Sequence, residues 1–224
     1  MNVLIIMHVE SEGPGTLGAS LESSGAGVRL ARVYTGERLP EDIDGLQAII
    51  SMGGPMNVYE EQEYPFLKDE TTLLQKAIAS NLPVLGICLG AQMIAKASGA
   101  RVVRSPKEEV GWGKISLTDA GRTDLLFSGL PATLDVLQWH GDMFEIPEAG
   151  ALIATGDDCP NQAFRYCNAF GLQFHVEVTR DILADWFKDS PDLEKILRTY
   201  DQLKPDLNRH AERLFKNFLS LFRR

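Results

Sequence analysis

The chain has 224 residues, of which 44% are hydrophobic, and this suits one large globular domain or one domain with an extension. Its formal net charge of −9 argues against a general affinity for nucleic acid or anionic membranes. No apolar run approaches the roughly 20 residues that span a bilayer, and the first residues show no basic leader or small-residue cleavage site. We therefore expect a cytoplasmic protein without nucleic-acid or membrane partners.

The charge is distributed unevenly along the chain. Residues 1–178 carry 12 Lys and Arg against 23 Asp and Glu, whereas residues 179–224 carry 10 against 8. The three cysteines, Cys88, Cys159 and Cys167, are odd in number and lack zinc-finger spacing. We expect a main domain over 1–178, an extension over 179–224 that packs on it, a reducing compartment, and neither a metal site nor a cofactor.

The first half of the chain alternates short apolar runs with helical periodicity. The predicted strands are Val3–Met7, Val28–Val33, Gln47–Ser51 and Val84–Ile87. The predicted helices are Thr16–Ser24, Tyr64–Ser80 and Leu89–Ser98. This alternation predicts an α/β fold with a doubly wound, mostly parallel sheet covered by helices on both faces.

The pattern changes after Arg101. Short strands joined by turns are predicted at Ile115–Leu117, Thr133–Gln138, Leu152–Thr155, Gln162–Tyr166 and Phe170–Phe174. We expect them as antiparallel additions at an edge of the main sheet. From Thr179 the chain is predicted to be helical, and an apolar stripe from Leu207 to Leu221 is expected to pack on the main domain.

Gly86-Ile87-Cys88-Leu89-Gly90 lies between a predicted strand and a predicted helix. A sharp strand-to-helix turn brings the backbone close to itself two residues before and two residues after its central residue, where glycine avoids a clash. The turn strains the central residue and projects its side chain from the sheet, at a helix N-terminus that favours a thiolate. This context favours Cys88 as a catalytic nucleophile over a buried structural cysteine.

A cysteine nucleophile usually works with a histidine that an acid orients. Of the four histidines, only His175 has an acid two residues away at a predicted strand end. Residues i and i+2 of an extended chain face the same side, so His175 and Glu177 are predicted to face the site together.

Acyl chemistry also needs hydrogen-bond donors for an oxyanion. Gly53-Gly54-Pro55 follows a predicted buried strand and could present a backbone N–H. Gly54 is the better candidate, with Gly53 as the alternative. The N–H of Leu89, directly after the cysteine, is predicted to be the second donor.

The three motifs, in this order, closely resemble those of class I (triad-type) glutamine amidotransferases, over about residues 3–178. Met52-Gly53-Gly54-Pro55-Met56-Asn57-Val58-Tyr59-Glu60 is most similar to stand-alone homologues of the GMP synthase amidotransferase domain. The resemblance implies a flavodoxin-like fold and a thiolate that attacks the side-chain amide of glutamine. Ammonia would leave, and water would hydrolyse the γ-glutamyl thioester.

By position, the resemblance implies that Cys88 is the nucleophile, His175 the general base and acid, and Glu177 the orienting acid. Gly54 and Leu89 match the oxyanion donors. Residues expected to contact substrate are Gly53, Gln92, Gly141 and Asp142. Trp139-His140-Gly141-Asp142 falls where the family places a loop in the pocket wall, with Trp139 in place of a common serine, and His140 is expected to be structural.

Three functions remain open from the sequence. The chain contains no P-loop and no Ser-Gly-Gly-x-Asp-Ser motif, so we expect it not to make GMP by itself. It could supply ammonia from glutamine to a separate synthase subunit, or hydrolyse γ-glutamyl compounds such as peptides without an acceptor. A non-catalytic regulatory role is the third alternative, and the complete triad argues against it.

Overall fold

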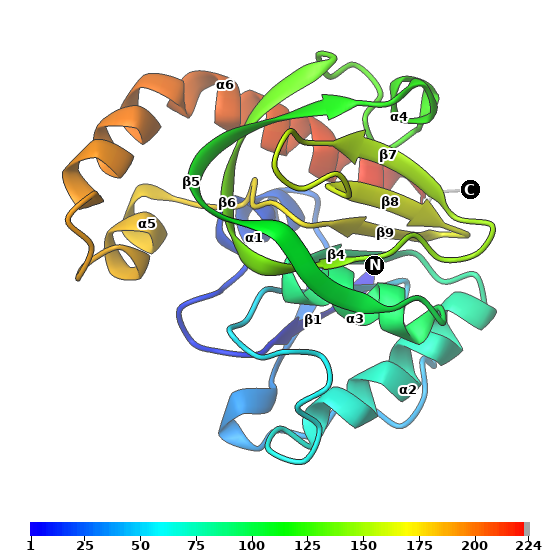
Figure 1. The fold of residues 1–224 in the computed structure, drawn as a ribbon. Coiled ribbons are helices and arrows are strands. Elements are labelled where there is room, and N and C mark those ends of the chain that lie inside the picture. Colours follow the sequence, from blue (N-terminus) through cyan, green and yellow to red (C-terminus); the bar gives the residue numbers. More distant parts are fainter. Residues whose placement is uncertain (222–224) are drawn as a thin grey trace.

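The computed structural model describes residues 1–221 and contains a nine-stranded sheet in the order β2-β1-β3-β4-β9-β8-β7-β5-β6 (Figure 1). The strands are β1 Asn2–Met7, β2 Gly27–Arg32, β3 Ala48–Ser51, β4 Val84–Ile87, β5 Val102–Leu117, β6 Thr133–Phe144, β7 Ala151–Thr155, β8 Ala163–Tyr166 and β9 Ala169–Leu172. The helices are α1 Gly15–Ser23, α2 Phe66–Ala79, α3 Leu89–Ala97, α4 Asp119–Thr123, α5 Arg180–Trp186 and α6 Leu193–Ser220, with a 3₁₀ turn at Val33–Thr35.

Strands β2, β1, β3 and β4 pair in parallel, as expected for the first half of the chain. The segment predicted as Phe170–Phe174 is the exception, because β9 is not an antiparallel edge strand. It pairs in parallel with β4 and antiparallel with β8. The carboxyl ends of β4 and β9 therefore lie side by side, and the residues that follow them, Cys88 and His175, emerge at the same edge of the sheet.

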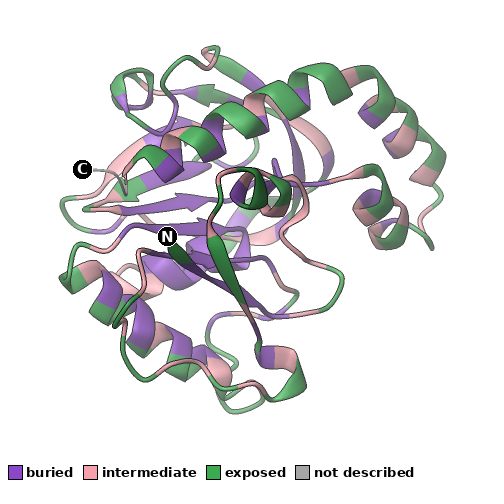
Figure 2. Ribbon diagram, turned by 180° about the vertical axis from the view of Figure 1, so that it is seen from behind, coloured by how far each residue is buried: buried purple, intermediate pink, exposed green. Residues whose placement is uncertain are grey.

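Helices cover both faces of the parallel strands, and the alternating residues of β1 show how. Val3 and Ile5 belong to one buried cluster together with residues of α1 and α6. Leu4 and Ile6 belong to a second cluster with residues of α2 and α3. Side chains on successive strand residues point to opposite faces, so a strand buried on both faces is apolar throughout. Figure 2 shows the buried strands between these layers of helices.

Strands β5 and β6 form a long antiparallel pair that curves across the front of the sheet in Figure 1. Both are much longer than the predicted Ile115–Leu117 and Thr133–Gln138. Their register shifts between Arg104 and Glu109, where Pro106 lies in a β-bulge. The extra length of β6 includes residues 139–142, which the sequence predicted as a loop.

The helical tail contacts the rest of the protein in two places. Ala211, Leu214 and Phe218 of α6 lie in the same buried cluster as β1 and α1, so the predicted apolar stripe packs inward. Helix α5 and the first half of α6 form a smaller cluster with Leu137 of β6. Residues 222–224, included in the predicted extension, lie outside the described residues.

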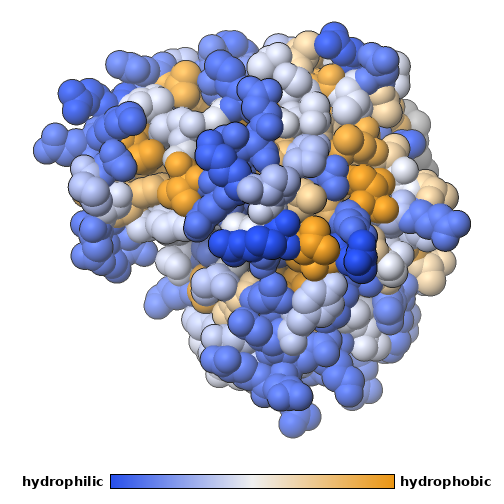
Figure 3. Space-filling model, in the orientation of Figure 1, coloured by the Kyte–Doolittle hydropathy of each residue, from blue (hydrophilic) through white to orange (hydrophobic). Residues whose placement is uncertain are grey.

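Figure 3 shows that hydrophobic side chains on the front face gather in small areas separated by hydrophilic ones. Within residues 1–221, no helix combines the length and apolarity needed to cross a membrane.

Candidate active site

Cys88 lies between β4 and α3 in a backbone conformation that side-chain-bearing residues rarely adopt, with φ 52° and ψ −107°. A Cβ on Gly86 would lie 2.4 Å from the carbonyl carbon of Gly90, and a Cβ on Gly90 would lie 2.1 Å from the carbonyl oxygen of Ser51. The two glycines therefore permit the turn, as predicted, and the turn directs the thiol out of the sheet.

The strain at Cys88 predicts that glycine is more stable than alanine at this position, the reverse of the usual order. In ordinary helix or strand positions glycine is less stable than alanine by roughly 0.5–1 kcal/mol. A positive φ costs a residue with a Cβ about 1–3 kcal/mol, which glycine avoids. We therefore expect Cys88→Gly to unfold at a higher denaturant concentration than Cys88→Ala, by about 1 kcal/mol in unfolding free energy. Alanine more stable than glycine would contradict strain at the elbow.

His175 follows β9, and its Nδ1 lies 2.7 Å from Oε1 of Glu177. The other carboxylate oxygen of Glu177 accepts a hydrogen bond of 3.0 Å from the backbone N–H of Val176. Both side chains are almost fully buried. The carboxylate thus fixes the imidazole ring with Nε2 free for another partner, which is the geometry predicted for a base and its orienting acid.

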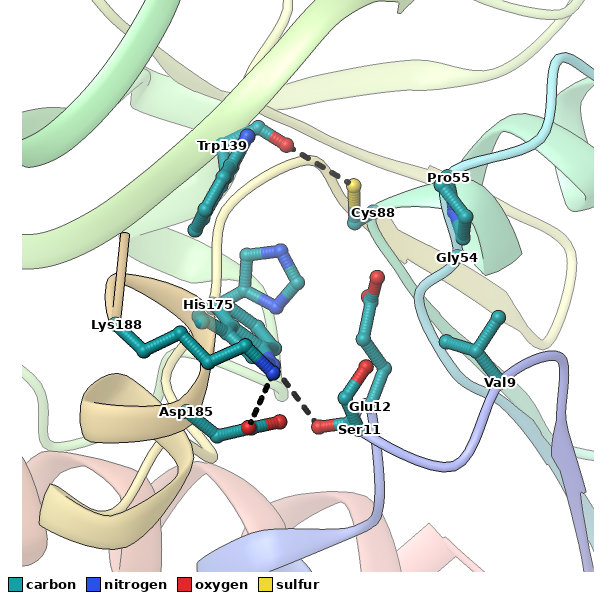
Figure 4. A pocket seen from close by; sticks show the side chains of 11 residues that line it. Val9, Ser11, Glu12, Gly54, Pro55, Cys88, Trp139, His175, Asp185 and Lys188 are labelled. Atoms are coloured by element: carbon teal, nitrogen blue, oxygen red, sulfur yellow. Dashed lines mark hydrogen bonds and ion pairs between the residues drawn. The ribbon is translucent and has the colours of Figure 1, made fainter. Parts of the chain in front are cut away.

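Cys88 and His175 both line a cavity of about 360 Å³, in which the Cys88 thiol donates to the carbonyl of Trp139 at 3.7 Å (Figure 4). Burial by itself lowers the pKa of His175. The carboxylate of Glu177 and hydrogen bonds to Cys88 and Glu177 outweigh burial, so the pKa of His175 is raised well above its ordinary value of 6.5. A histidine held in the charged form stabilises a neighbouring thiolate.

Gly54 lines the same cavity and lies beside the side chain of Leu89. The two are so close that a Cβ on Gly54 would lie 2.8 Å from Cδ2 of Leu89. The N–H of Gly90 is already bonded to the carbonyl of Met52 at 3.1 Å. Leu89 is the first residue of α3, where a backbone N–H has no partner within the helix. The positions of Gly54 and Leu89 therefore suit two donors that face an oxyanion beside Cys88.

A buried pair behind the glycine loop orients the peptide between Gly53 and Gly54. Nδ1 of His8 donates to the carbonyl of Gly53 at 3.0 Å, and Nε2 lies 2.7 Å from Oε2 of Glu70. In a trans peptide the C=O and the next N–H point in opposite directions. Because His8 holds the carbonyl on one side, the N–H of Gly54 is directed to the other side.

We expect His8→Asn to lower kcat for the reaction proposed below by about 10- to 100-fold with little change in KM, because one oxyanion donor loses its fixed direction. Steady-state kinetics test this expectation. Thermal unfolding of the variant shows whether it is folded at the assay temperature, because the substitution also removes a buried partner of Glu70. An unchanged kcat in a folded variant would contradict the role of His8.

A second cavity of about 260 Å³ meets the first at Cys88 and Gly54. It is lined by three of the four predicted substrate-contact residues, Gln92, Gly141 and Asp142. Gln92 donates from Nε2 to the carbonyl of Asp142 at 3.2 Å. Gly141 and Asp142 lie on strand β6, so the predicted loop is a strand edge. The fourth residue, Gly53, lies behind Gly54 with its carbonyl bound to His8.

Sequence reasoning missed several residues that line the first cavity. Glu12 points toward Cys88 and His175 in Figure 4, and the α-carbon of Gly53 lies against its carboxyl group. Burial raises the pKa of Glu12, and the charge on His175 opposes the rise. Trp186 and Lys188 come from the tail, where no motif marked them. Nε1 of Trp186 donates to the carbonyl of Ser11 at 2.9 Å, which joins the tail to the loop after β1.

The fold and these side chains together define an α/β protein of the nucleophile-elbow type. Residues 16–184 match the family model of class I glutamine amidotransferases, three quarters of the chain. The chain therefore belongs to the class I glutamine amidotransferase family, which confirms the resemblance found in its sequence.

Individual relatives agree with this assignment. The chain is 34% identical over 183 residues to YfeJ of Salmonella typhimurium, a glutamine amidotransferase-like protein, covering 80% of this chain and 77% of YfeJ. It is 35% identical over 149 residues to GMP synthase of Porphyromonas gingivalis, covering 65% of this chain but 28% of that enzyme. A glutamine amidotransferase from Thermotoga maritima superposes with a TM-score of 0.90 at 32% identity, with 97% of each chain covered.

Proposed function

We propose that this protein hydrolyses the side-chain amide of glutamine through a γ-glutamyl thioester on Cys88. The observation that carries the proposal is the single cavity shared by a strained Cys88 and the His175 ring, with Glu177 2.7 Å behind that ring. Family membership supports the same chemistry.

In the first half of the reaction, the Cys88 thiolate attacks the amide carbon of glutamine and the carbonyl oxygen becomes an oxyanion. The backbone N–H groups of Gly54 and Leu89 stabilise that oxyanion. The imidazolium of His175 donates its proton to the leaving nitrogen, so the C–N bond breaks and ammonia departs. Cys88 is left as a γ-glutamyl thioester, and His175 is neutral.

In the second half, neutral His175 removes a proton from water as the water oxygen attacks the thioester carbon. The C–S bond breaks, glutamate leaves, and the thiolate and imidazolium are restored. The Glu177 carboxylate, 2.7 Å from Nδ1 of His175, stabilises the imidazolium that exists at the start and the end of each cycle.

Charged groups in the second cavity suit the amino-acid end of glutamine. Nη1 of Arg104 lies 3.6 Å from Oδ1 of Asp142, and Asn57 donates to Oδ2 of Asp142 at 2.7 Å. We propose that Arg104 binds the α-carboxylate of the substrate and Asp142 its α-ammonium group. The cavity thereby presents one charge of each sign to a zwitterion.

Arg104→Gln is expected to raise KM for glutamine by about tenfold or more while kcat changes little, because a charge-assisted hydrogen bond is worth roughly 1.5–3 kcal/mol. Arg101→Gln is the matched control, since Arg101 is similarly exposed and pairs with Glu145 rather than lining the cavity. Initial-rate kinetics over a range of glutamine concentrations separate KM from kcat. An equal effect of both substitutions would contradict the assignment.

Ammonia released here is proposed to serve a separate synthase subunit. Support comes from the GMP synthases similar to this chain, because the matched region covers about 28% of their length. Glutamate release from glutamine, measured with the purified chain alone, tests the hydrolytic step. Absence of glutamate release under all conditions, including with candidate synthase partners, would contradict the proposed function.

A γ-glutamyl peptide hydrolase is the second candidate, and the first cavity favours it. That cavity is much larger than ammonia requires, and aromatic residues Trp139 and Trp186 line it with Glu12 and Lys188. The first cavity includes both Cys88 and His175. Because His175 protonates the leaving nitrogen, a leaving amine would occupy this cavity. Comparing kcat/KM for glutamine and a γ-glutamyl dipeptide distinguishes the two functions: a higher value for the dipeptide favours the second.

A further inference from the structure

Three side chains beside the substrate cavity form a cluster that the proposed reaction does not use. A ring nitrogen of His140, Sγ of Cys159 and a carboxylate oxygen of Glu109 all lie within 4.8 Å of one another, and Nε2 of His140 is 3.1 Å from Oε2 of Glu109. They come from three segments of the chain. Glu109 and His140 are register partners on β5 and β6, and Cys159 lies in the turn between β7 and β8.

The hydrogen bonding of His140 leaves one ring nitrogen facing the cluster. Nδ1 lies 3.0 Å from the carbonyl of Asp142, so Nδ1 carries a hydrogen and donates it. Nε2 lies 3.1 Å from Oε2 of Glu109, yet within residues 1–221 it has no partner with hydrogen-bond geometry. In the neutral ring, Nε2 then carries a buried lone pair 3.1 Å from a carboxylate oxygen, and a cation bound to both atoms relieves the repulsion between them.

Other buried polar groups around the cluster are also unsatisfied. Five buried side-chain nitrogen or oxygen atoms have no hydrogen-bond partner in the described chain, and three of them belong to this region. They are Nε2 of His140, Oγ of Ser105 and Oε1 of Gln138. Ser105 lies within hydrogen-bonding reach of Cys159. Gln138 donates from Nε2, not from its unpartnered oxygen, to Gln162, and Gln162 donates to Glu109. The buried, unpartnered Nε2 of His140 lies at the cluster itself and indicates an ion or ordered water there.

We propose that Glu109, His140 and Cys159 bind one Zn²⁺ ion, with water as the fourth ligand. Thiolate, imidazole and carboxylate are the ligand types that zinc prefers. The two negative charges of Glu109 and the Cys159 thiolate balance the charge of the ion. Tetrahedral zinc sets donor separations of roughly 3.2–3.8 Å. Nε2 of His140 and Oε2 of Glu109 are already 3.1 Å apart, and no separation in the cluster exceeds 4.8 Å, so small side-chain movements complete the site. The thiol proton of Cys159 passes to solvent as the ion binds.

The groups behind the ligands fit this assignment. Metal-bound histidines typically donate their other ring N–H to a carbonyl or carboxylate, as His140 does to Asp142. Glu109 in turn accepts a hydrogen bond of 2.8 Å from Nε2 of Gln162. The carbonyl of Asp142 also accepts from Gln92, so the ion would hold strand β6 where it borders the substrate cavity.

Cobalt(II) is a suitable probe because a cobalt–thiolate bond gives an ultraviolet charge-transfer band. The full chain carrying Cys88→Ala, which removes the active-site thiol, is stripped with a chelator and titrated with Co²⁺ and then Zn²⁺. We expect a thiolate band that saturates at one equivalent of Co²⁺ and disappears when Zn²⁺ is added. No thiolate band at one equivalent would overturn the proposal.

Two variants and one control locate the site. Cys159→Ser in the same background should abolish the band, whereas Cys167→Ser should retain it, because Cys167 is exposed and outside the cluster. Glu109→Gln keeps the shape of the side chain and should weaken Zn²⁺ affinity by at least about tenfold. If Cys159→Ser does not fold, Glu109→Gln decides: unchanged affinity overturns the proposal. Metal binding in a catalytically inactive background remains testable even if the proposed hydrolysis is wrong.

Discussion

Replacing Cys88 with alanine is expected to lower kcat for glutamine hydrolysis on the order of 10⁵-fold or more. Without the thiol no γ-glutamyl thioester can form, and the reaction must proceed by direct attack of water. Neither Cys159, which is fully buried, nor Cys167, which is exposed on the turn between β8 and β9, lines the cavity. They cannot replace the missing nucleophile.

Cys167→Ala is a close control for this experiment. Like Cys88, Cys167 has a positive φ, of 53°, so both alanine variants place the same side chain on a similarly unusual backbone. Glutamate release should be unchanged in Cys167→Ala. Circular dichroism should show both variants folded, and substantial glutaminase activity in a folded Cys88→Ala protein would refute the role of Cys88.

The second large effect is expected from Glu177→Gln, which should lower kcat by about 10³- to 10⁴-fold. The amide cannot stabilise the imidazolium of His175 and can hold the ring in the wrong tautomer. The buried carboxylate accepts hydrogen bonds from both His175 and the backbone of Val176, so the substitution retains volume but loses the charge. Glu145→Gln, at an exposed ion pair with Arg101, is a control for general charge effects.

The same substitution should change the pH profile. The active thiolate–imidazolium pair is lost when pH rises through the pKa of His175, which is raised well above 6.5. We expect kcat/KM to fall on the alkaline side only at a pH well above 6.5. In Glu177→Gln this fall should occur at lower pH, because the carboxylate is one cause of the raised pKa of His175. A fall that stays at the same pH would show that Glu177 does not set the protonation of His175.

Stability should follow the same linkage. Because the folded pKa of His175 is raised, its charged form contributes stability that is fully present below pH 6.5 and is lost as pH rises through the folded pKa. The buried pair of His8 and Glu70 acts in the same direction, since the pKa of His8 is also raised despite burial. Glu177→Gln should therefore weaken the fall of unfolding free energy with rising pH without abolishing it.

Local sequence patterns predicted the parallel half of the fold mainly because β1, β3 and β4 are buried on both faces and nearly continuously apolar, whereas β2 is a mostly exposed edge strand. They also predicted the elbow, since the close approach of Gly86 and Gly90 to neighbouring backbone leaves a pattern within five residues. They did not predict the length of β5, where Pro106, Gly111 and several charged residues have low strand propensity. The partners of β9 depend on contacts distant in sequence, which local periodicity does not contain.

The same distinction applies to the candidate site. His175 and Glu177 are two residues apart, so their pairing was predictable from an extended chain. Glu12, Trp186 and Lys188 reach the cavity only because the loop after β1 and the tail fold over the end of the sheet. The cluster around Cys159 brings together three segments without a spacing motif. Sites of this kind become visible only when the fold is known.

Covalent capture of the nucleophile is the most direct test of the central claim. The purified chain is incubated with a glutamine-analogue electrophile, and intact-protein and peptide mass spectrometry locate the adduct. We predict one adduct per chain, located on Cys88, and we predict that excess glutamine suppresses its formation. Exposure alone would favour the opposite result, because Cys88 is only 6% exposed whereas Cys167 is exposed. Labelling of Cys167 instead, or labelling that glutamine does not suppress, would contradict the assignment of Cys88 as a nucleophile that acts on γ-glutamyl amides.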